Sequence, residues 1–275
     1  MIYFNPQSNI TPTVLATDLD GTLIPLPDSP ENNESLNTLK CKLSDSNKTL
    51  VYATGRHFES ALEAMTEYKL PRTDWIICDV GSAIYVNRGG VYLPFTPYEA
   101  HLSETVGGVD RKKVESQLQG IDGLELQPPD HQQRFKISYQ SDANQVEPLV
   151  ATVNVRLEEA KLPYYCMGSH DPFLNCGLLD VMPSGVSKAY ALIWLSTHAD
   201  FTPDEVIYSG DSGNDYAALT SGFRAIVVSN HSVGLADKVR TEAKSRGLED
   251  RIFLAKNTAT TGVLEGCEHY GLFDT

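Results

Sequence analysis

Short apolar runs alternate with amphipathic segments in the first and last thirds of the chain. The apolar runs predict buried strands over residues 14–17, 49–53, 75–78, 205–209, 224–229 and 251–255. The segments that follow them carry apolar residues at helical spacing and predict helices over 31–43, 58–68, 187–198, 216–220, 232–246 and 260–270. This strand–helix alternation is typical of a parallel sheet with crossover helices. We therefore predict a Rossmann-like α/β core.

The middle third of the chain has a different pattern. Polar residues are more frequent there, residues 134–139 alternate in polarity, 146–161 form an amphipathic helical pattern, and 178–182 predict another strand. This pattern favours an antiparallel sheet with helices on one face. We expect an inserted α+β domain over 98–182, with the core domain formed by 1–97 and 183–275.

Composition restricts the class of partner. The chain has 275 residues and a formal net charge of −14, which argues against sequence-independent binding to nucleic acid or anionic lipid. An anionic substrate then requires local cations. No apolar run approaches the roughly 18 residues of a membrane span, and the N-terminal residues lack a signal-peptide pattern. We expect a cytoplasmic protein without a membrane or nucleic-acid partner. The sequence leaves the oligomeric state open.

The five cysteines are scattered and form no CxxC pair. This spacing argues against a disulfide framework or a zinc ribbon. Cys166 and Cys176 could face each other across a hairpin, but we expect all five to be reduced.

Two carboxylates, Asp18 and Asp20, follow the first predicted strand directly, and Gly21 comes next. In a strand, residues two apart point to the same side, so the two charges would repel each other. A cation can offset this repulsion, and hard oxygen ligands of this kind suit Mg²⁺. The alternative interpretation is a pair of solvated loop aspartates.

Polar residues also follow other predicted strands of the core. They are Thr54, Lys188, Asp211, Asn214 and Asp215. In an open α/β sheet, ligands bind at the carboxyl ends of the strands, so these side chains should converge with the first two aspartates. Taken singly, three of them have a simpler explanation: Thr54 could end a strand or cap the next helix, Lys188 could be solvated, and Asp215 could cap the short helix after it.

Together these residues predict a phosphoryl-transfer site. Asp18 would be the nucleophile that forms an aspartyl-phosphate, and Asp20 would be the general acid and base. Thr54 and Lys188 would hold phosphate oxygens as further catalytic residues. The expected Mg²⁺ site comprises Asp18, Asp20 (through its backbone carbonyl), Asp211 and Asp215. Asp215 could be a direct ligand, but we favour a role in which it holds Lys188 or a metal-bound water. The expected substrate contacts are Thr54, Gly55, Arg56, Lys136, Lys188 and Asn214.

The segments DLDGTL, ATGR and GDSGND, with a lysine near a helix start between the last two, resemble the motifs of the haloacid dehalogenase (HAD) superfamily in their order. This resemblance implies Asp18 as nucleophile, Asp20 as acid and base, Mg²⁺ as cofactor, and a C2-type cap that sets specificity. The segments YATGRHFES, DVGSAIY, FKISY and LDVMPSGVSK further resemble the sucrose-phosphate phosphatase subfamily. Two segments, CMGSHDPFLNCG and HQQRF, depart from its pattern where specificity would be decided.

We therefore expect a phosphoric monoester hydrolase that acts on a small-molecule sugar phosphate resembling sucrose-6-phosphate. The enzymatic alternatives are phosphatases for mannosylfructose-phosphate, trehalose-6-phosphate or a glycosyl-glycerate phosphate, and a phosphomutase. An alternative from another class is a non-catalytic, phosphate-sensing binding protein. The intact Asp20 argues against that alternative, because a sensor does not need an acid and base.

Overall fold

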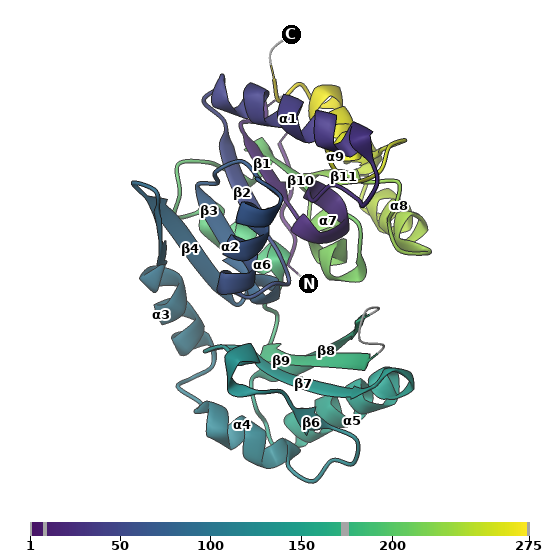
Figure 1. Cartoon of the computed structure of the whole chain (residues 1–275). Coiled ribbons are helices and arrows are strands. Elements are labelled where there is room, and N and C mark those ends of the chain that lie inside the picture. The colour runs from purple at the N-terminus through teal and green to yellow at the C-terminus, as the bar shows by residue number, and fades with distance from the viewer. Residues whose placement is uncertain (1, 8–9, 172–175, 274–275) are drawn as a thin grey trace. The chain divides into compact units, whose positions relative to one another are not determined.

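The structure is a computed structural model that describes residues 2–7, 10–171 and 176–273 (Figure 1). The chain divides into two compact units, one formed by Met1–Pro94 with Ser187–Thr275 and the other by Phe95–Val186. The sequence pattern had placed these divisions at 97/98 and 182/183, a few residues away. Among the described residues, no helix is both long and apolar enough to cross a membrane.

The first unit contains a mostly parallel sheet, as predicted. Within the described residues its strand order is β12-β11-β10-β1-β2-β3-β4-β5. The strands are β1 (Val14–Thr17), β2 (Thr49–Ala53), β3 (Trp75–Cys78), β4 (Ala83–Arg88), β5 (Val91–Pro94), β10 (Val206–Gly210), β11 (Arg224–Val227) and β12 (Ile252–Leu254). The antiparallel strands β4 and β5 were not predicted. β5 is the edge strand, and three of its four residues are exposed although its sequence VYLP is apolar, so an apolar run does not mark a buried strand here.

Helices connect the strands of this sheet. They are α1 (Pro30–Ser44), α2 (Phe58–Glu67), α6 (Lys188–Ser196), α7 (Tyr216–Thr220), α8 (Leu235–Ser245) and α9 (Ala259–His269). All four residues of β1 are buried, and Leu36 and Leu39 of α1 are buried on the helix face toward the core. Burial of each such leucine contributes about 1.5–3 kcal/mol. The helices therefore cover a sheet whose central strands β1 and β10 are wholly buried.

The second unit contains a smaller antiparallel sheet with the order β6-β7-β9-β8. Its elements are α3 (Thr96–Thr105), α4 (Arg111–Leu118), β6 (Glu125–Leu126), β7 (Ile137–Asp142), α5 (Val146–Glu159), β8 (Tyr164–Asp171) and β9 (Cys176–Pro183). Helix α5 buries Val146, Leu149, Val153 and Leu157, which share one face, and it contacts β8 and β9. The antiparallel α+β insert matches the sequence pattern.

All five cysteines are free thiols, as expected. Cys166 and Cys176 do lie on the paired strands β8 and β9, but Cys166 is opposite Val181 and Cys176 is opposite Asp171. The strand register therefore keeps these two cysteines apart.

Candidate active site

The turn after β1 separates the two aspartates of the first motif. Strand β1 ends at Thr17, Asp18 is still extended, and the chain then turns tightly over Leu19–Leu23. Gly21 permits the turn because its φ is +71°, and a Cβ there would lie 2.5 Å from the Asp211 carboxylate. The Asp18 side chain is only 6% exposed, whereas that of Asp20 is 54% exposed. Asp20 therefore lies in the turn and not in the strand, so the strand geometry expected for this pair does not apply.

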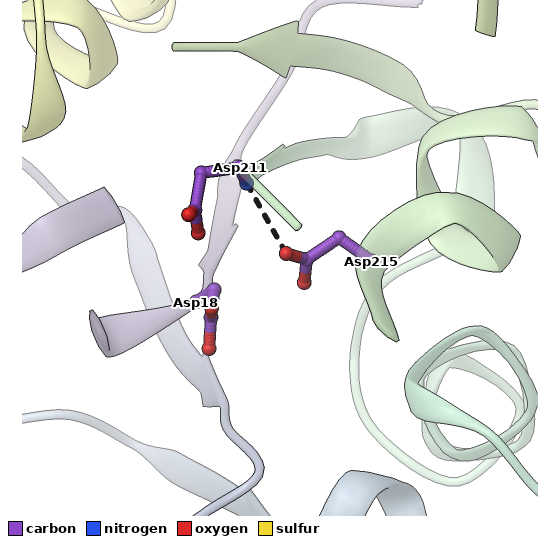
Figure 2. Close-up of side chains that lie close together, drawn as sticks. All are labelled: Asp18, Asp211 and Asp215. Carbon is purple, nitrogen blue, oxygen red and sulfur yellow. Dashed lines mark hydrogen bonds between the residues drawn. The ribbon is translucent and has the colours of Figure 1, made fainter. Parts of the chain in front are cut away.

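Three carboxylates gather where β1 and β10 end. Each of Asp18, Asp211 and Asp215 offers an oxygen within 4.8 Å of the others'. They meet because β1 and β10 are parallel neighbours in the sheet, so residues that follow the two strands lie side by side. Figure 2 shows the three side chains and the hydrogen bond from the Asp211 backbone N–H to the Asp215 carboxylate (3.1 Å).

Lys188 is the cation of this cluster. Ser187 caps the start of α6, and Lys188 is the first residue of that helix. Its Nζ lies 2.8 Å from Oδ1 of Asp18 and 2.8 Å from Oδ1 of Asp215, and the whole residue is buried. Burial disfavours the charge, but the two carboxylates outweigh this effect and raise the pKa of Lys188 above its usual value. The solvated-lysine alternative is therefore excluded.

The Asp215 carboxylate is saturated with hydrogen bonds. Its Oδ1 accepts from Lys188 Nζ and from the Tyr208 hydroxyl (2.6 Å). Its Oδ2 accepts from the backbone N–H groups of Asp211 and Ser212 (3.1 Å each) and from the Ser212 hydroxyl (3.2 Å). A carboxylate has about four lone-pair sites, so these donors occupy it. The Asp215 side chain thus closes the capping box of the turn Gly213–Asp215 and also fixes the lysine. It makes no side-chain cap of α7, so the helix-cap alternative for Asp215 is wrong.

Uncompensated negative charge remains at the site. Burial and the neighbouring Asp215 and Asp211 raise the pKa of Asp18 well above its usual value, against the effect of Lys188. Burial and Asp215 raise the pKa of Asp211 to about 6, although the Thr22 hydroxyl donates to it (2.8 Å). Three carboxylates and one lysine leave a deficit of positive charge among hard oxygen donors. This donor set fits Mg²⁺.

Thr54 and Arg56 follow β2. Thr54 is fully buried, and its hydroxyl accepts the backbone N–H of Arg56 (3.1 Å). The cap of α2 is His57, so the helix-cap alternative for Thr54 is wrong. The Arg56 guanidinium holds both oxygens of Asp20, with Nε at 2.8 Å from Oδ2 and Nη2 at 2.7 Å from Oδ1. The candidate acid and base is thus paired with an expected substrate contact.

A strained turn after β3 links the Thr54 segment to α6. The three residues Asp79–Gly81 all have left-handed φ values, of 52°, 56° and 105°. Backbone N–H groups of this turn donate to the carbonyls of Thr54 (3.1 Å) and Arg56 (3.0 Å). A Cβ on Gly81 would lie 2.2 Å from the Ser187 carbonyl oxygen, so only glycine allows this close packing. The turn therefore sets the distance between the Thr54 segment and the start of α6.

The other expected substrate contacts fall into two groups. Asn214 lies beside Gly55, since its amide nitrogen is 3.6 Å from the position of a Cβ on that glycine. Lys136 belongs to the second unit, where its Nζ lies 3.4 Å from Oδ1 of Asp180. The roles of these residues stay predictions. The sequence did not single out Tyr208 or Thr22, although Thr22 stands inside the first motif.

The parallel sheet, with a carboxylate cluster and a buried lysine at its carboxyl edge, defines a hydrolase of the HAD superfamily. The sequence model of sucrose-6F-phosphate phosphohydrolases matches residues 11–271, and the chain belongs to that family. It is accordingly a phosphoric monoester hydrolase of the sugar-phosphate phosphatase type.

Several known proteins are similar to the chain over nearly its whole length. Mannosylfructose-phosphate phosphatase of Agrobacterium fabrum is 26% identical over 94% of this chain and 97% of its own. Sucrose-phosphatase 1 of Nicotiana tabacum is 28% identical over 94% of this chain and 59% of its own. The X-ray structure of the Synechocystis sp. PCC6803 sucrose-phosphatase, in complex with sucrose and phosphate, aligns with a TM-score of 0.78. It is 25% identical and covers 97% of this chain and 100% of its own.

Proposed function

We propose that the protein is a Mg²⁺-dependent phosphatase that hydrolyses a disaccharide phosphate resembling sucrose-6F-phosphate through an aspartyl-phosphate on Asp18. The observation that carries this proposal is the arrangement around Asp18, which is buried, held by Lys188 at 2.8 Å and clustered with Asp211. A buried, oriented carboxylate beside a fixed ammonium can attack phosphorus while the ammonium offsets the charge of the phosphoryl oxygens.

The first half-reaction transfers the phosphoryl group to the protein. A carboxylate oxygen of Asp18 forms a bond to phosphorus as the bond from phosphorus to the sugar oxygen breaks. Asp20 gives its proton to that oxygen, so the sugar leaves as an alcohol. Asp20 then takes a proton from the water that attacks the acyl-phosphate, which releases inorganic phosphate and restores the Asp18 carboxylate.

Mg²⁺, when bound by Asp18, Asp211 and the backbone carbonyl of Asp20, supplies positive charge that offsets repulsion between the substrate phosphate and these carboxylates. The Asp215 carboxylate orients Lys188 and the backbone that carries Asp211. We place it as a positioning residue because its five hydrogen bonds leave no free lone pair.

The ion pair of Asp20 with Arg56 belongs to the resting enzyme in this mechanism. A carboxylate that offers both oxygens to a guanidinium carries no proton to donate. Proton donation to the leaving sugar therefore requires Asp20 to leave Arg56. The anionic substrate is the natural replacement partner for the freed guanidinium.

The experiment that tests the proposed function is a phosphate-release assay on a panel of sugar phosphates with Mg²⁺ and with EDTA. The panel contains sucrose-6F-phosphate, mannosylfructose-phosphate, trehalose-6-phosphate, a glycosyl-glycerate phosphate and simple hexose phosphates. We expect a kcat/KM for one disaccharide phosphate at least about tenfold above that for the hexose phosphates, and loss of turnover with EDTA. Equal turnover of every substrate, or full activity in EDTA, would contradict the proposal.

Mannosylfructose-phosphate is the second candidate substrate, because the Agrobacterium phosphatase named for it matches nearly the full length of both chains. A preference for it in the panel would decide between the two disaccharides. If the protein bound phosphate with Mg²⁺ but turned over no substrate, the phosphate-sensing alternative would replace both.

We further propose that the second unit sets the sugar specificity, since it interrupts the core between the Thr54 and Lys188 segments of the sequence. Lys136→Met should raise KM for the preferred disaccharide phosphate and leave KM for p-nitrophenyl phosphate unchanged. The exposed Lys113→Met in α4 of the same unit serves as the control. Equal effects on both substrates would count against a specificity role.

A further inference from the structure

Tyr208 is a buried titratable residue that the proposed mechanism does not use. It lies in the middle of β10 and is completely buried. Its register partners on the neighbouring strands are Ala16 of β1 and Ala225 of β11. Residues in register point to the same face of a sheet, so two small side chains flank the tyrosine ring and leave it room. Apolar packing therefore explains the ring, whereas the hydroxyl needs a polar partner.

Gly210 brings that partner within reach. Residues two apart in a strand point to the same side, so Gly210 and Tyr208 share one face of β10. A Cβ on Gly210 would lie 2.5 Å from Cγ of Asp215, so the missing side chain admits the Asp215 carboxylate to this face. The Tyr208 hydroxyl donates to Oδ1 of Asp215 at 2.6 Å. Burial and the charges of Asp215 and Asp18 raise the pKa of Tyr208 well above its usual value, so the hydroxyl keeps its proton and stays a donor.

The same carboxylate oxygen also accepts from Lys188. The Lys188 Nζ donates to Oδ1 of Asp215 at 2.8 Å and lies 2.8 Å from Oδ1 of Asp18. Two donors thus share Asp215 Oδ1, and each reduces the negative charge that this oxygen offers to the other. All four residues are buried, where such electrostatic effects are strong. The hydroxyl thereby weakens the hold of Asp215 on the ammonium, which leaves the ammonium shared with Asp18.

We propose that Tyr208 is a positioning residue for phosphoryl transfer, which acts through Oδ1 of Asp215 to keep the Lys188 ammonium between Asp215 and Asp18. This inference rests on the proposed function, in which that ammonium offsets the charge of the phosphoryl oxygens. Without the hydroxyl, only Lys188 among the described residues donates to Asp215 Oδ1, which then draws the ammonium away from Asp18. Because the ammonium acts on charge that develops in the transition state, the loss falls on kcat and not on KM.

Steady-state kinetics of Tyr208→Phe on p-nitrophenyl phosphate with Mg²⁺ test the proposal. The matched control is Tyr52→Phe, because Tyr52 of β2 is also completely buried and its hydroxyl also donates at 2.6 Å, to the Pro71 carbonyl. We expect Tyr208→Phe to lower kcat at least about fivefold with KM within about twofold of the wild-type value, and Tyr52→Phe to change neither. Equal kcat values for the two variants, or a loss confined to KM, would overturn the proposal.

A second comparison separates positioning from packing. In a Lys188→Met background, Tyr208→Phe should lower kcat by less than about twofold, because the group through which the hydroxyl acts is gone. An equal loss in both backgrounds would mean that the hydroxyl only supports the fold, and it would overturn the proposal. Asp18→Asn tests the proposed function separately. Turnover that persists in Asp18→Asn would refute the aspartyl-phosphate, while the two comparisons would still decide the role of Tyr208.

A measurement independent of turnover follows the hydroxyl protons of Tyr208 and Tyr52, which burial protects from exchange with water. Proton NMR of tyrosine-labelled protein in EDTA compares the wild type with Lys188→Met. We expect the Tyr208 signal to move downfield in Lys188→Met, because Asp215 Oδ1 then interacts more strongly with the hydroxyl, and the Tyr52 signal to stay in place. This comparison decides the proposal if Tyr208→Phe does not fold or the wild type does not hydrolyse the substrate. An unchanged Tyr208 signal would overturn it.

Discussion

Replacing Lys188 by methionine tests how the buried charges of the active site are balanced. The Lys188 ammonium lies 2.8 Å from a carboxylate oxygen of both Asp18 and Asp215, and it is completely buried. Methionine keeps much of the apolar stem and removes the charge. Two buried carboxylates then lose their cation, and breaking a buried pair in this way costs about 3–5 kcal/mol of unfolding free energy. Loss of one stabilising donor at the transition state also lowers kcat by about 10²–10³.

The cost should depend on pH. In the variant the pKa of Asp18 rises further, because its cation is gone, so the folded state takes up a proton that the unfolded state does not hold. A carboxyl with a raised folded-state pKa contributes stability that is complete below its unfolded-state pKa and is lost as pH rises through the folded-state pKa. The loss of stability in Lys188→Met is therefore smaller in mild acid and larger at alkaline pH.

Urea unfolding in EDTA at several pH values measures this effect, and phosphate release measures the catalytic loss. Lys244→Met, on the exposed face of α8, is the matched control. Adding Asp215→Asn to Lys188→Met removes one of the two orphaned carboxylates and should restore part of the lost stability. The reasoning is refuted if Lys188→Met unfolds at the same urea concentration as Lys244→Met at every pH.

Three further predictions follow from the site. The pKa of Asp211 is raised to about 6 without metal, so protons compete with Mg²⁺ for this carboxylate. The apparent Mg²⁺ affinity measured by titration should therefore fall as pH drops through about 6. An affinity independent of pH between about 5 and 8 would contradict this. Gly81→Ala would place a Cβ 2.2 Å from the Ser187 carbonyl oxygen and should lower kcat at least about tenfold. The control is Gly89→Ala, at a left-handed position with nothing within 4 Å of the added Cβ, which should leave kcat unchanged. Equal kcat values for the two variants would show that the turn at Gly81 does not position the site. Arg56→Met should raise KM more than it lowers kcat in steady-state kinetics, because the change removes a substrate contact and frees Asp20, the candidate acid. An unchanged KM would show that the Arg56 guanidinium does not contact the substrate.

Much of the site could be predicted because its residues follow strands of one parallel sheet. Thr17 of β1 is in register with Ser209 of β10, so Asp18 and Asp211 become neighbours despite their distance in sequence. That convergence depends only on strand order and direction, which the alternation of apolar and amphipathic segments indicates. Lys188 is the exception, because the strand before it, β9, belongs to the second sheet and Lys188 enters the site as the first residue of α6.

Other features depend on contacts that the local sequence does not mark. The Asp20 side chain is exposed for two reasons: Gly21 adopts a left-handed φ in the turn, and the guanidinium of Arg56, which follows β2, holds the carboxylate. Tyr208 lies in an apolar strand, so the sequence does not distinguish it from a core residue, yet its hydroxyl lies 2.6 Å from the Asp215 carboxylate.

The central claim is that Asp18 carries the phosphoryl group during turnover. The direct test is acid quenching of a single turnover with radiolabelled disaccharide phosphate, followed by measurement of label on the protein. We predict label on the wild type, label that both forms and disappears more slowly on Asp20→Asn because the sugar is not protonated and water is not activated, and none on Asp18→Asn. Label that persists on Asp18→Asn, or phosphate release with no labelled protein in the wild type or in Asp20→Asn, would contradict the account.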